Sequence, residues 1–188
     1  MKDKETILKK NIESILNEIE KSLNKGCYDD LDKTIKLILW SKNIVTAGAG
    51  RMGYAIKCFS MRLSHLGIKS FHWGDTTCPP VTEKDCFIVA SGSGETPHIV
   101  ELAKIAKNSG AKIIWIGVNE DSIISKLSDC KILIKSVSKN ATDVKSMQPM
   151  TTLTEQSTLI LCDALVLLLM KELELNEKSM KSNHCNLE

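Results

Sequence analysis

Hydroxyl side chains are concentrated in one short segment whose spacing favours binding of a phosphate group. The segment SGSGETP, residues 91–97, carries Ser91, Ser93 and Thr96 as three hydroxyl donors, and Pro97 closes it. Proline is typical of the first turn of a helix, where free backbone N–H groups and the positive end of the helix dipole attract an anion. We interpret the segment as a cradle for a phosphate monoester.

The glycines of this segment, Gly92 and Gly94, let the backbone wrap closely around an anion. A simpler interpretation needs no ligand: Thr96 would be the N-cap of the helix, and the two serines would be turn residues. We favour the phosphate because capping needs one hydroxyl and the segment offers three.

A second glycine loop, GAGRMG at residues 48–53, matches the dinucleotide fingerprint G-x-G-x-x-G. It follows an apolar run that reads as a strand, and the fingerprint also expects an acid about 20 residues further on to bind the ribose. Asp75 stands at about that distance. A nucleotide-binding oxidoreductase is therefore one hypothesis, although two helical segments precede this strand and another glycine loop follows it.

The elements that must position these loops alternate between strands and helices. Short β-branched or aromatic runs predict buried parallel strands at 43–47, 68–73, 86–90, 112–117 and 131–134. Helical periodicity predicts helices at 4–25, 29–40, 52–66, 97–109 and 122–128, and a helix of about 25 residues from Pro149 after a polar loop at 135–148. The alternation predicts an α/β fold, a parallel sheet with helices on both faces.

The two glycine loops follow strands whose carboxyl ends would be neighbours in such a sheet. Open α/β sheets bind their ligands in a crevice at this edge. We therefore expect Arg51, Asp75 and the segment 91–96 to surround one crevice. A single small phosphorylated molecule would fill it.

The composition indicates one domain, residues 1–188, and excludes some classes of partner. A net charge of +2 gives no support for binding to nucleic acid or to a membrane surface. Seven cysteines without a C-x-x-C pair fit a reducing cytoplasm. The N-terminus has no apolar signal-peptide core, and the apolar run 159–170 is shorter than a bilayer span and carries Asp163. It predicts a buried helix, one face of which packs on a partner subunit.

Five motifs in the order GAGRMG, GDTTCP, SGSGET, QPMTTLTEQ and NHCNLE extend over nearly the whole chain. Together they resemble the sugar isomerase (SIS) domain family, and within it the 6-phospho-3-hexuloisomerases. The resemblance implies a flavodoxin-like, three-layer SIS domain with a five-stranded parallel sheet, assembled as a homotetramer. It also implies interconversion of 3-hexulose 6-phosphate and fructose 6-phosphate through a cis-enediol, without a metal or another cofactor.

The resemblance also implies roles for individual residues. Ser91, Ser93 and Thr96 would hold the phosphate, Glu155 would be the base, and His184 would reach the site of a neighbouring subunit from the tail. His65 is a weaker catalytic candidate. The expected substrate-binding residues are Gly50, Arg51, Asp75, Ser91, Gly92, Ser93, Gly94 and Thr96.

The chemistry can be compared with these residues independently. Moving a carbonyl between C3 and C2 needs a base for the C2 proton, donors for the enediol and return of a proton to C3. A carboxylate and a histidine suffice. Taken alone, however, Glu155 is also an ordinary acid near a helix start, His184 a surface histidine in a flexible tail, and His65 a residue able to cap its helix.

The chain departs from the usual family motifs at four positions. Met52 stands where serine is usual, Thr151 where glycine is common, Asn183 where arginine is usual, and Cys185 where alanine is usual. Met52 removes a hydroxyl from the crevice and Asn183 removes a cation. A different sugar phosphate as substrate, or a non-catalytic phosphosugar sensor, is therefore an alternative to the hexuloisomerase.

We divide the single domain into three parts. Residues 1–41 are expected to form N-terminal helices, 42–174 the α/β core, and 175–188 a tail that reaches a neighbouring subunit.

Overall fold

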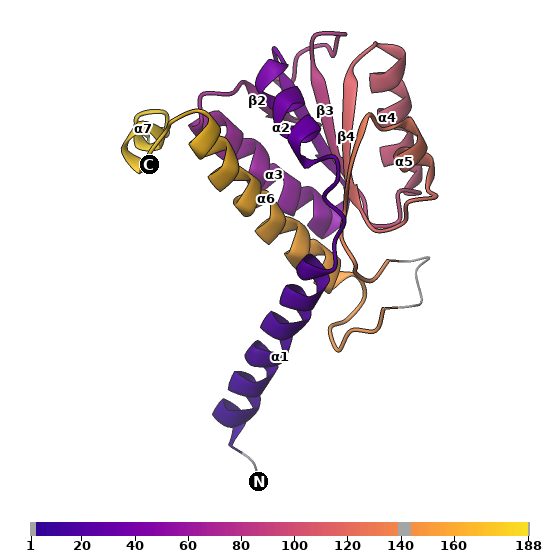
Figure 1. The fold of residues 1–188 in the computed structure, drawn as a ribbon, viewed down its shortest axis with the longest axis vertical. Coiled ribbons are helices and arrows are strands. Elements are labelled where there is room, and N and C mark those ends of the chain that lie inside the picture. The colour runs from indigo at the N-terminus through magenta and orange to yellow at the C-terminus, as the bar shows by residue number, and fades with distance from the viewer. Residues whose placement is uncertain (1–2, 139–143, 188) are drawn as a thin grey trace.

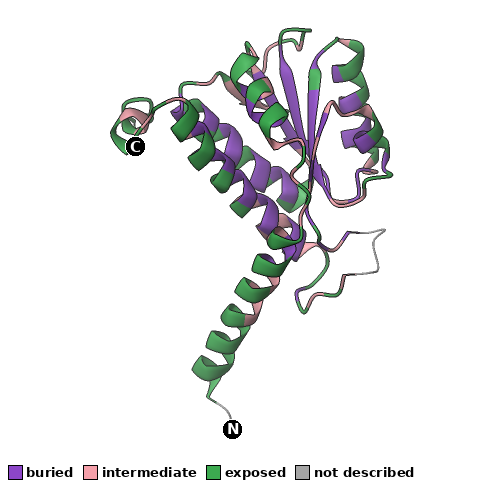
Figure 2. Cartoon of the chain, viewed as in Figure 1, coloured by how far each residue is buried: buried purple, intermediate pink, exposed green. Residues whose placement is uncertain are grey.

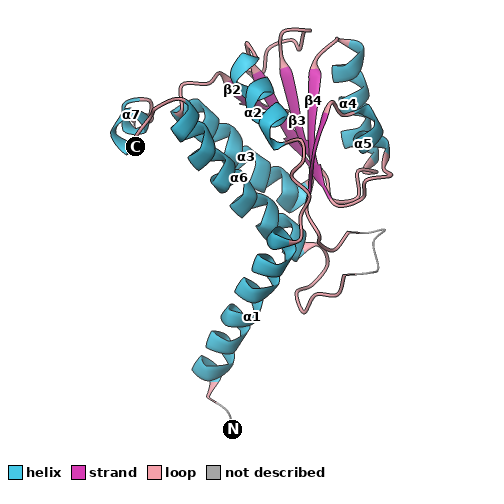
Figure 3. Ribbon diagram, viewed as in Figure 1, coloured by secondary structure: helices cyan, strands magenta, loops and turns pink. Residues whose placement is uncertain are grey.

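The computed structural model describes residues 3–138 and 144–187. Residues 139–143 of the expected polar loop and Glu188 of the closing motif lie outside the described residues. One five-stranded sheet carries helices on both faces (Figures 1 and 3). The predicted three-layer α/β architecture is confirmed, whereas the division into three parts stays a prediction.

All strands are parallel and pair in the order β2-β1-β3-β4-β5. The strands are β1 Ile44–Gly48, β2 Ser70–His72, β3 Cys86–Ala90, β4 Lys112–Gly117 and β5 Cys130–Leu133. This is the flavodoxin-like order, in which the strand sequence reverses between β1 and β3. Gly48 of β1 pairs with Ala90 of β3, so the two glycine loops leave the sheet side by side.

Three helices, α2 Leu31–Trp40, α3 Gly50–His65 and α6 Thr152–Glu172, lie over one face of the sheet (Figure 1). The apolar side chains that α3 buries recur at helical spacing; they are Met52, Ile56, Phe59 and Leu63. The helices α3 and α6 pack side by side. The start of α6 therefore lies beside the start of α3, next to the carboxyl ends of the strands.

The opposite face carries α4 Pro97–Asn108 and α5 Ile123–Leu127. Trp115 of β4 is fully buried in this layer, and its indole N–H donates a 3.0 Å hydrogen bond to the backbone oxygen of Ser91. A buried tryptophan usually needs a partner for its N–H. Here the partner is the loop that begins the predicted phosphate cradle, so the core fixes where this loop leaves β3.

A buried carboxylate joins the starts of β1 and β3. Asp85 is 1% exposed and accepts hydrogen bonds from the backbone N–H (3.1 Å) and Nδ2 (2.8 Å) of Asn43. It also accepts bonds from the backbone N–H (2.8 Å) and hydroxyl (2.7 Å) of Thr82. Burial raises the pKa of Asp85, but these bonds outweigh it and hold the pKa below its ordinary value.

The first helix, α1 Lys4–Asn24, projects away from the body of the domain (Figure 1). Its attachment lies near its end, where Ile19 and Ser22 are buried and Ser22 accepts a 3.3 Å hydrogen bond from Ser157 of α6. Figure 2 shows that most of the projecting part is exposed. The large apolar side chains exposed there are Ile7, Leu8, Ile12 and Leu16.

Among the described residues, α6 is the one helix whose length and composition would allow it to cross a membrane, and half of that apolar stretch is buried inside the chain. It buries the polar side chains of Thr154, Ser157 and Thr158 together with its apolar ones. Its outward side still exposes large apolar side chains, namely Ile160, Leu167 and Leu168. The helix is thus a core helix with a second apolar side.

The predicted elements agree with the structure to within a few residues at their ends. The edge strand β2 is shorter than the run 68–73, because it pairs only with β1 and all three of its residues stay half-buried. The tail contains an additional short helix, α7 Glu177–Ser182, whose first turn is capped by Asn176. No helix was predicted there.

Candidate active site

The segment Ser91–Thr96 connects β3 to α4 and forms the first wall of a pocket. Ser91 and Ser93 are buried, and their oxygens accept hydrogen bonds from the backbone N–H groups of Gly94 (3.2 Å) and Glu95 (3.3 Å). Each hydroxyl hydrogen can therefore still be donated to a ligand. Both serines do form turn contacts, as the simpler interpretation expected.

Thr96 occupies the N-cap of α4, but its side chain makes no capping hydrogen bond. Pro97 follows in the first turn, and Thr96 lines the pocket. The side chain of Thr96 therefore leaves the start of α4 uncapped next to the pocket, and an uncapped helix start favours an anion. Gly94 has φ +64°, and a Cβ built on it would lie 2.0 Å from Ser122 Oγ, so this position of the cradle requires glycine.

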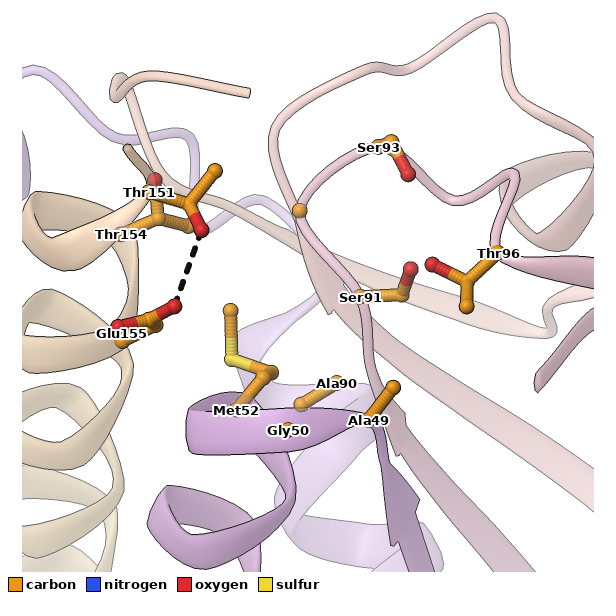
Figure 4. A pocket seen from close by; sticks show the side chains of 11 residues that line it. Ala49, Gly50, Met52, Ala90, Ser91, Ser93, Thr96, Thr151, Thr154 and Glu155 are labelled. Atoms are coloured by element: carbon orange, nitrogen blue, oxygen red, sulfur yellow. Dashed lines mark hydrogen bonds between the residues drawn. The ribbon is translucent and has the colours of Figure 1, made fainter. Parts of the chain in front are cut away.

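The pocket has a volume of about 270 Å³ and is shared by three segments of the chain. The first glycine loop, the segment 91–96 and the start of α6 contribute its walls (Figure 4). Its lining residues are Ala49, Gly50, Met52, Ala90, Ser91, Gly92, Ser93, Thr96, Thr151, Thr154 and Glu155. A carboxylate and the predicted phosphate cradle thus face one space.

Glu155 lies in the first turn of α6, and both of its carboxylate oxygens have partners. Oε1 accepts a 2.9 Å hydrogen bond from the hydroxyl of Thr151, and Oε2 accepts a 2.5 Å hydrogen bond from Nε of Arg51. The side chain of Glu155 is 14% exposed and that of Arg51 is 64% exposed. The acid is therefore fixed in the pocket wall by two donors, and the arginine that pairs with it is mostly exposed and does not line the pocket.

Met52 extends into the pocket between Glu155 and Ser91 (Figure 4). It is 7% exposed and belongs to the apolar core beneath the site. A serine at this position would offer a hydroxyl, whereas Met52 presents an apolar thioether next to the carboxylate. The departure from the family motif therefore lies inside the pocket.

The first glycine loop serves close packing as well as the pocket wall. Gly50 has φ +55°, and a Cβ on Gly53 would lie 2.7 Å from the backbone oxygen of Gly48. The dinucleotide hypothesis also needs an acid at the same crevice, and Asp75 does not line it. The geometry therefore supports only the glycine part of that hypothesis.

Asp75 lines a different hollow, of about 440 Å³, together with Lys57 and His72. Its Oδ1 accepts a 2.8 Å hydrogen bond from Nζ of Lys57, and this bond lowers the pKa of Asp75 below its usual value. The expectation that Asp75 would join Arg51 at one crevice is not met within this chain, because Lys57 holds it further along α3. Its role in orienting a sugar hydroxyl stays a prediction.

The two candidate histidines lie together at the far end of α3. The ring centroids of His65 and His184 are 4.9 Å apart, and Nδ2 of Asn183 donates a 3.0 Å hydrogen bond to the backbone oxygen of His65. Arg51 starts the same helix, and its 16 residues span about 24 Å. Within one chain, neither histidine can contact Glu155.

The tail thus packs against its own α3 near His65, through Asn183 and the α7 helix. The prediction that His184 enters a neighbouring subunit's site is not tested, but its distance from the pocket of its own chain is compatible with it. Sequence reasoning did not assign Thr151 a contact with Glu155. The spacing of four residues at a helix start is a signal that could have identified this pair.

Comparison with known proteins agrees with this geometry. The SIS domain family matches residues 37–168, more than half of the chain. The 3-hexulose-6-phosphate isomerase of Bacillus subtilis is 36% identical over 94% of this chain and 97% of its own length. The 3-hexulose-6-phosphate isomerase of Methanocaldococcus jannaschii is 40% identical over 87% of each chain.

A crystal structure of a Methanococcus jannaschii protein, for which the function of 3-hexulose-6-phosphate isomerase has been inferred, superposes with a TM-score of 0.81. It is 34% identical, and the match covers 95% of this chain and 99% of that one. The chain therefore belongs to the SIS (sugar isomerase) domain family.

Proposed function

We propose that this protein is a phosphosugar isomerase that interconverts 3-hexulose 6-phosphate and fructose 6-phosphate. One observation carries the proposal: the Glu155 carboxylate and the hydroxyl-rich cradle at 91–96 line the same pocket of about 270 Å³. The names of the Bacillus subtilis and Methanocaldococcus jannaschii relatives support this choice of substrate.

In the proposed mechanism, the phosphate binds first at the start of α4. Ser91, Ser93 and Thr96 donate hydroxyl hydrogens, and the helix dipole stabilises the negative charge. Because the phosphate is remote from C2 and C3, its binding energy fixes the sugar without taking part in the bond changes. The carbon chain then extends towards Glu155.

Glu155 is proposed to remove the proton from C2 of the 3-ketose while a donor protonates the C3 carbonyl oxygen. The product of this step is the cis-enediol. Loss of the O2 proton and return of a proton from Glu155 to C3 complete fructose 6-phosphate. Arg51, which already contacts the Glu155 carboxylate, is suited to stabilise negative charge on the enediol oxygens.

A histidine from another subunit is proposed to move the proton between O2 and O3. His184 is exposed and lies beside the buried His65, far along α3 from the pocket of their own chain. A homo-oligomer, for which we propose a tetramer, would bring the exposed His184 to a neighbour's Glu155. His184 is our first choice for this role and His65 the second.

Two apolar surfaces support the proposed assembly. The projecting half of α1 exposes Ile7, Leu8, Ile12 and Leu16, and α6 exposes Leu167 and Leu168. Apolar surface of this kind on neighbouring helices is typical of a subunit interface. We expect copies of this chain to cover it.

We further propose a cytoplasmic enzyme that needs no metal or other cofactor. All seven cysteines are free, three of them buried, which fits a reducing compartment. The described residues contain no group of three or more His, Cys, Asp or Glu side chains that could hold a metal ion. The absence of a metal from the reaction nevertheless stays a prediction.

The test is turnover of 3-hexulose 6-phosphate generated in situ, with fructose 6-phosphate as the detected product. The sensor alternative predicts that fructose 6-phosphate raises the melting temperature while no solvent deuterium enters the sugar. An isomerase for another sugar phosphate would exchange deuterium into that other substrate only. Turnover of the hexulose excludes both alternatives.

A further inference from the structure

The Q-P-M motif before α6 contributes no residue to the pocket. In this segment the first residue that lines the pocket is Thr151, so Gln148, Pro149 and Met150 do not line the proposed substrate site. Met150 is 87% exposed and has φ +57°, a left-handed conformation that residues other than glycine rarely adopt. Such a turn persists when the residues around it determine its shape.

One carboxylate on α1 holds the chain immediately before this turn. Oε2 of Glu18 accepts hydrogen bonds from the hydroxyl of Ser146 (2.7 Å) and from Nε2 of Gln148 (3.1 Å). Oε1 of Glu18 accepts a 2.8 Å hydrogen bond from the backbone N–H of Met147. Three successive residues are therefore bound to one acid that stands about 130 positions earlier in the sequence.

The acid is itself fixed relative to α6. Glu18 precedes the buried Ile19 by one residue, and Ser22, one turn later, shares a 3.3 Å hydrogen bond with Ser157. Burial raises the pKa of Glu18, but the hydrogen bonds from Ser146, Met147 and Gln148 outweigh it, so the pKa lies below its ordinary value. The acid is therefore charged at neutral pH, the form that holds three donors.

The turn leads from segment 146–148 to the start of α6, where Glu155, the proposed catalytic base, is located. Thr152 donates from its N–H (3.3 Å) and its hydroxyl (2.7 Å) to the backbone oxygen of Pro149, which closes the turn onto α6. Thr151 then donates its hydroxyl to Glu155 at 2.9 Å. A shift of the turn would move this hydroxyl away from the carboxylate.

We propose that Glu18 is a positioning residue that holds segment 146–148 so that the turn sets Thr151 and Glu155 in their places in the pocket. The proposal rests on the proposed function for its effect on activity. It gives the Q-P-M motif a structural role, in which Gln148 is the partner of Glu18 instead of a ligand of the sugar. It also means that α1, the helix with the exposed apolar side chains, helps to support the site.

The experiment compares Glu18→Gln with the parent and with Glu20→Gln, which alters an exposed acid of the same helix. We expect Glu18→Gln to lower kcat by about tenfold or more, because small displacements of a catalytic group are costly. KM should change by less than about threefold, since segment 91–96 is untouched. Unchanged kcat in a folded Glu18→Gln protein would overturn the proposal.

A double-mutant cycle with Thr151→Ala tests the route of the effect. If Glu18 acts through the turn, the double variant should lie within about threefold of the slower single variant. Independent, multiplying losses in kcat would instead contradict the proposal. Should Glu18→Gln fail to fold, Ser146→Ala removes one of the three bonds and takes its place in the cycle.

Amide hydrogen exchange gives a readout that does not depend on substrate. In Glu18→Gln we expect exchange at 147–152 to rise at least tenfold, while that at 91–96 stays as in the parent. Equal exchange in parent and variant overturns the positioning role even if the protein is an active isomerase. Faster exchange in a protein without isomerase activity would instead refute the proposed function alone.

Discussion

The guanidinium Nε of Arg51 lies 2.5 Å from Oε2 of Glu155, although 104 positions separate the two residues in the chain. The contact joins the first glycine loop to the start of α6, where Glu155 lines the pocket and Arg51 does not. Arg51 is mostly exposed and Glu155 mostly buried, and we propose that the arginine turns towards a bound sugar while the acid stays in place. The first glycine loop, which matches the dinucleotide fingerprint, therefore places the cation of Arg51 beside the carboxylate of Glu155.

We predict that Arg51→Ala lowers kcat/KM by about 100-fold or more, because a charged donor is lost where negative charge develops in the transition state. The measurement is steady-state turnover of 3-hexulose 6-phosphate. Lys104→Ala is the matched control, since it removes an exposed cation of α4 that pairs with Glu101 and does not line the pocket. Equal effects of the two substitutions would refute the role of Arg51.

Met52 is predicted to keep water away from Glu155. Replacement by serine should admit water beside the carboxylate, so that more of the abstracted proton is exchanged before it returns to carbon. In D₂O, the Met52→Ser product should carry a larger share of solvent deuterium than the parent product. Met61→Ser alters an exposed methionine of the same helix and should leave that share unchanged.

Met52→Ser is also expected to cost about 2 to 4 kcal/mol of unfolding free energy, because the side chain belongs to the core. The exchange experiment therefore has to be run well below the melting temperature of the variant. Identical deuterium shares in Met52→Ser and parent would show that this side chain does not shield the base.

His184 is predicted to act in a neighbouring subunit. Glu155→Gln and His184→Ala proteins should each be nearly inactive, and oligomers reassembled from a mixture of both should regain activity, because some sites then combine an intact acid with an intact histidine. Truncation after Met180 should behave like His184→Ala. A mixture that stays inactive, although mass spectrometry detects mixed oligomers, would place the histidine outside the reaction.

Asp85 is predicted to make stability depend on acid pH. Its pKa is lowered by folding from an ordinary value of 3.8, so the folded state binds fewer protons than the unfolded state. The stabilisation is therefore complete above the ordinary pKa and is lost as the pH falls through the lower pKa of the folded state. Chemical denaturation of the parent and of Asp85→Asn at several pH values measures this difference.

Asp85→Asn should cost about 2 kcal/mol or more near neutral pH, since the buried bonds to Asn43 and Thr82 lose a charged acceptor. The gap between parent and variant should narrow below pH 4 as the parent carboxylate is protonated. A gap that stays constant down to pH 2 would show that folding does not depend on the charge of Asp85.

The sheet and the phosphate cradle could be predicted because their signals are local. Each buried strand is a short β-branched run, and the segment 91–97 contains its own turn, hydroxyls and helix start. The position of Ser91 next to Gly50 then follows from the general rule that ligands bind where the strand order of such sheets reverses. These parts of the site needed no information about long-range packing.

The remaining parts depend on how helices pack, which periodicity does not specify. The contact between Arg51 and Glu155 requires α6 to lie along α3 in one register. The hydrogen bonds of Glu18 to residues 146–148 require α1 to pack against α6. Asp75 stands at the distance from the first glycine loop that is expected of a ribose-binding acid. In the structure, however, it pairs with Lys57 in a hollow separate from the pocket that Glu155 lines. The tail beside His65 had no local apolar pattern that would predict its placement.

The most direct test of the central claim is turnover of 3-hexulose 6-phosphate by the parent and by Glu155→Gln, with Glu101→Gln, an exposed acid of α4, as control. We predict that the parent and the control form fructose 6-phosphate at equal rates, and that Glu155→Gln is slower by at least about 1,000-fold while still binding fructose 6-phosphate. A Glu155→Gln protein as active as the parent would contradict the account.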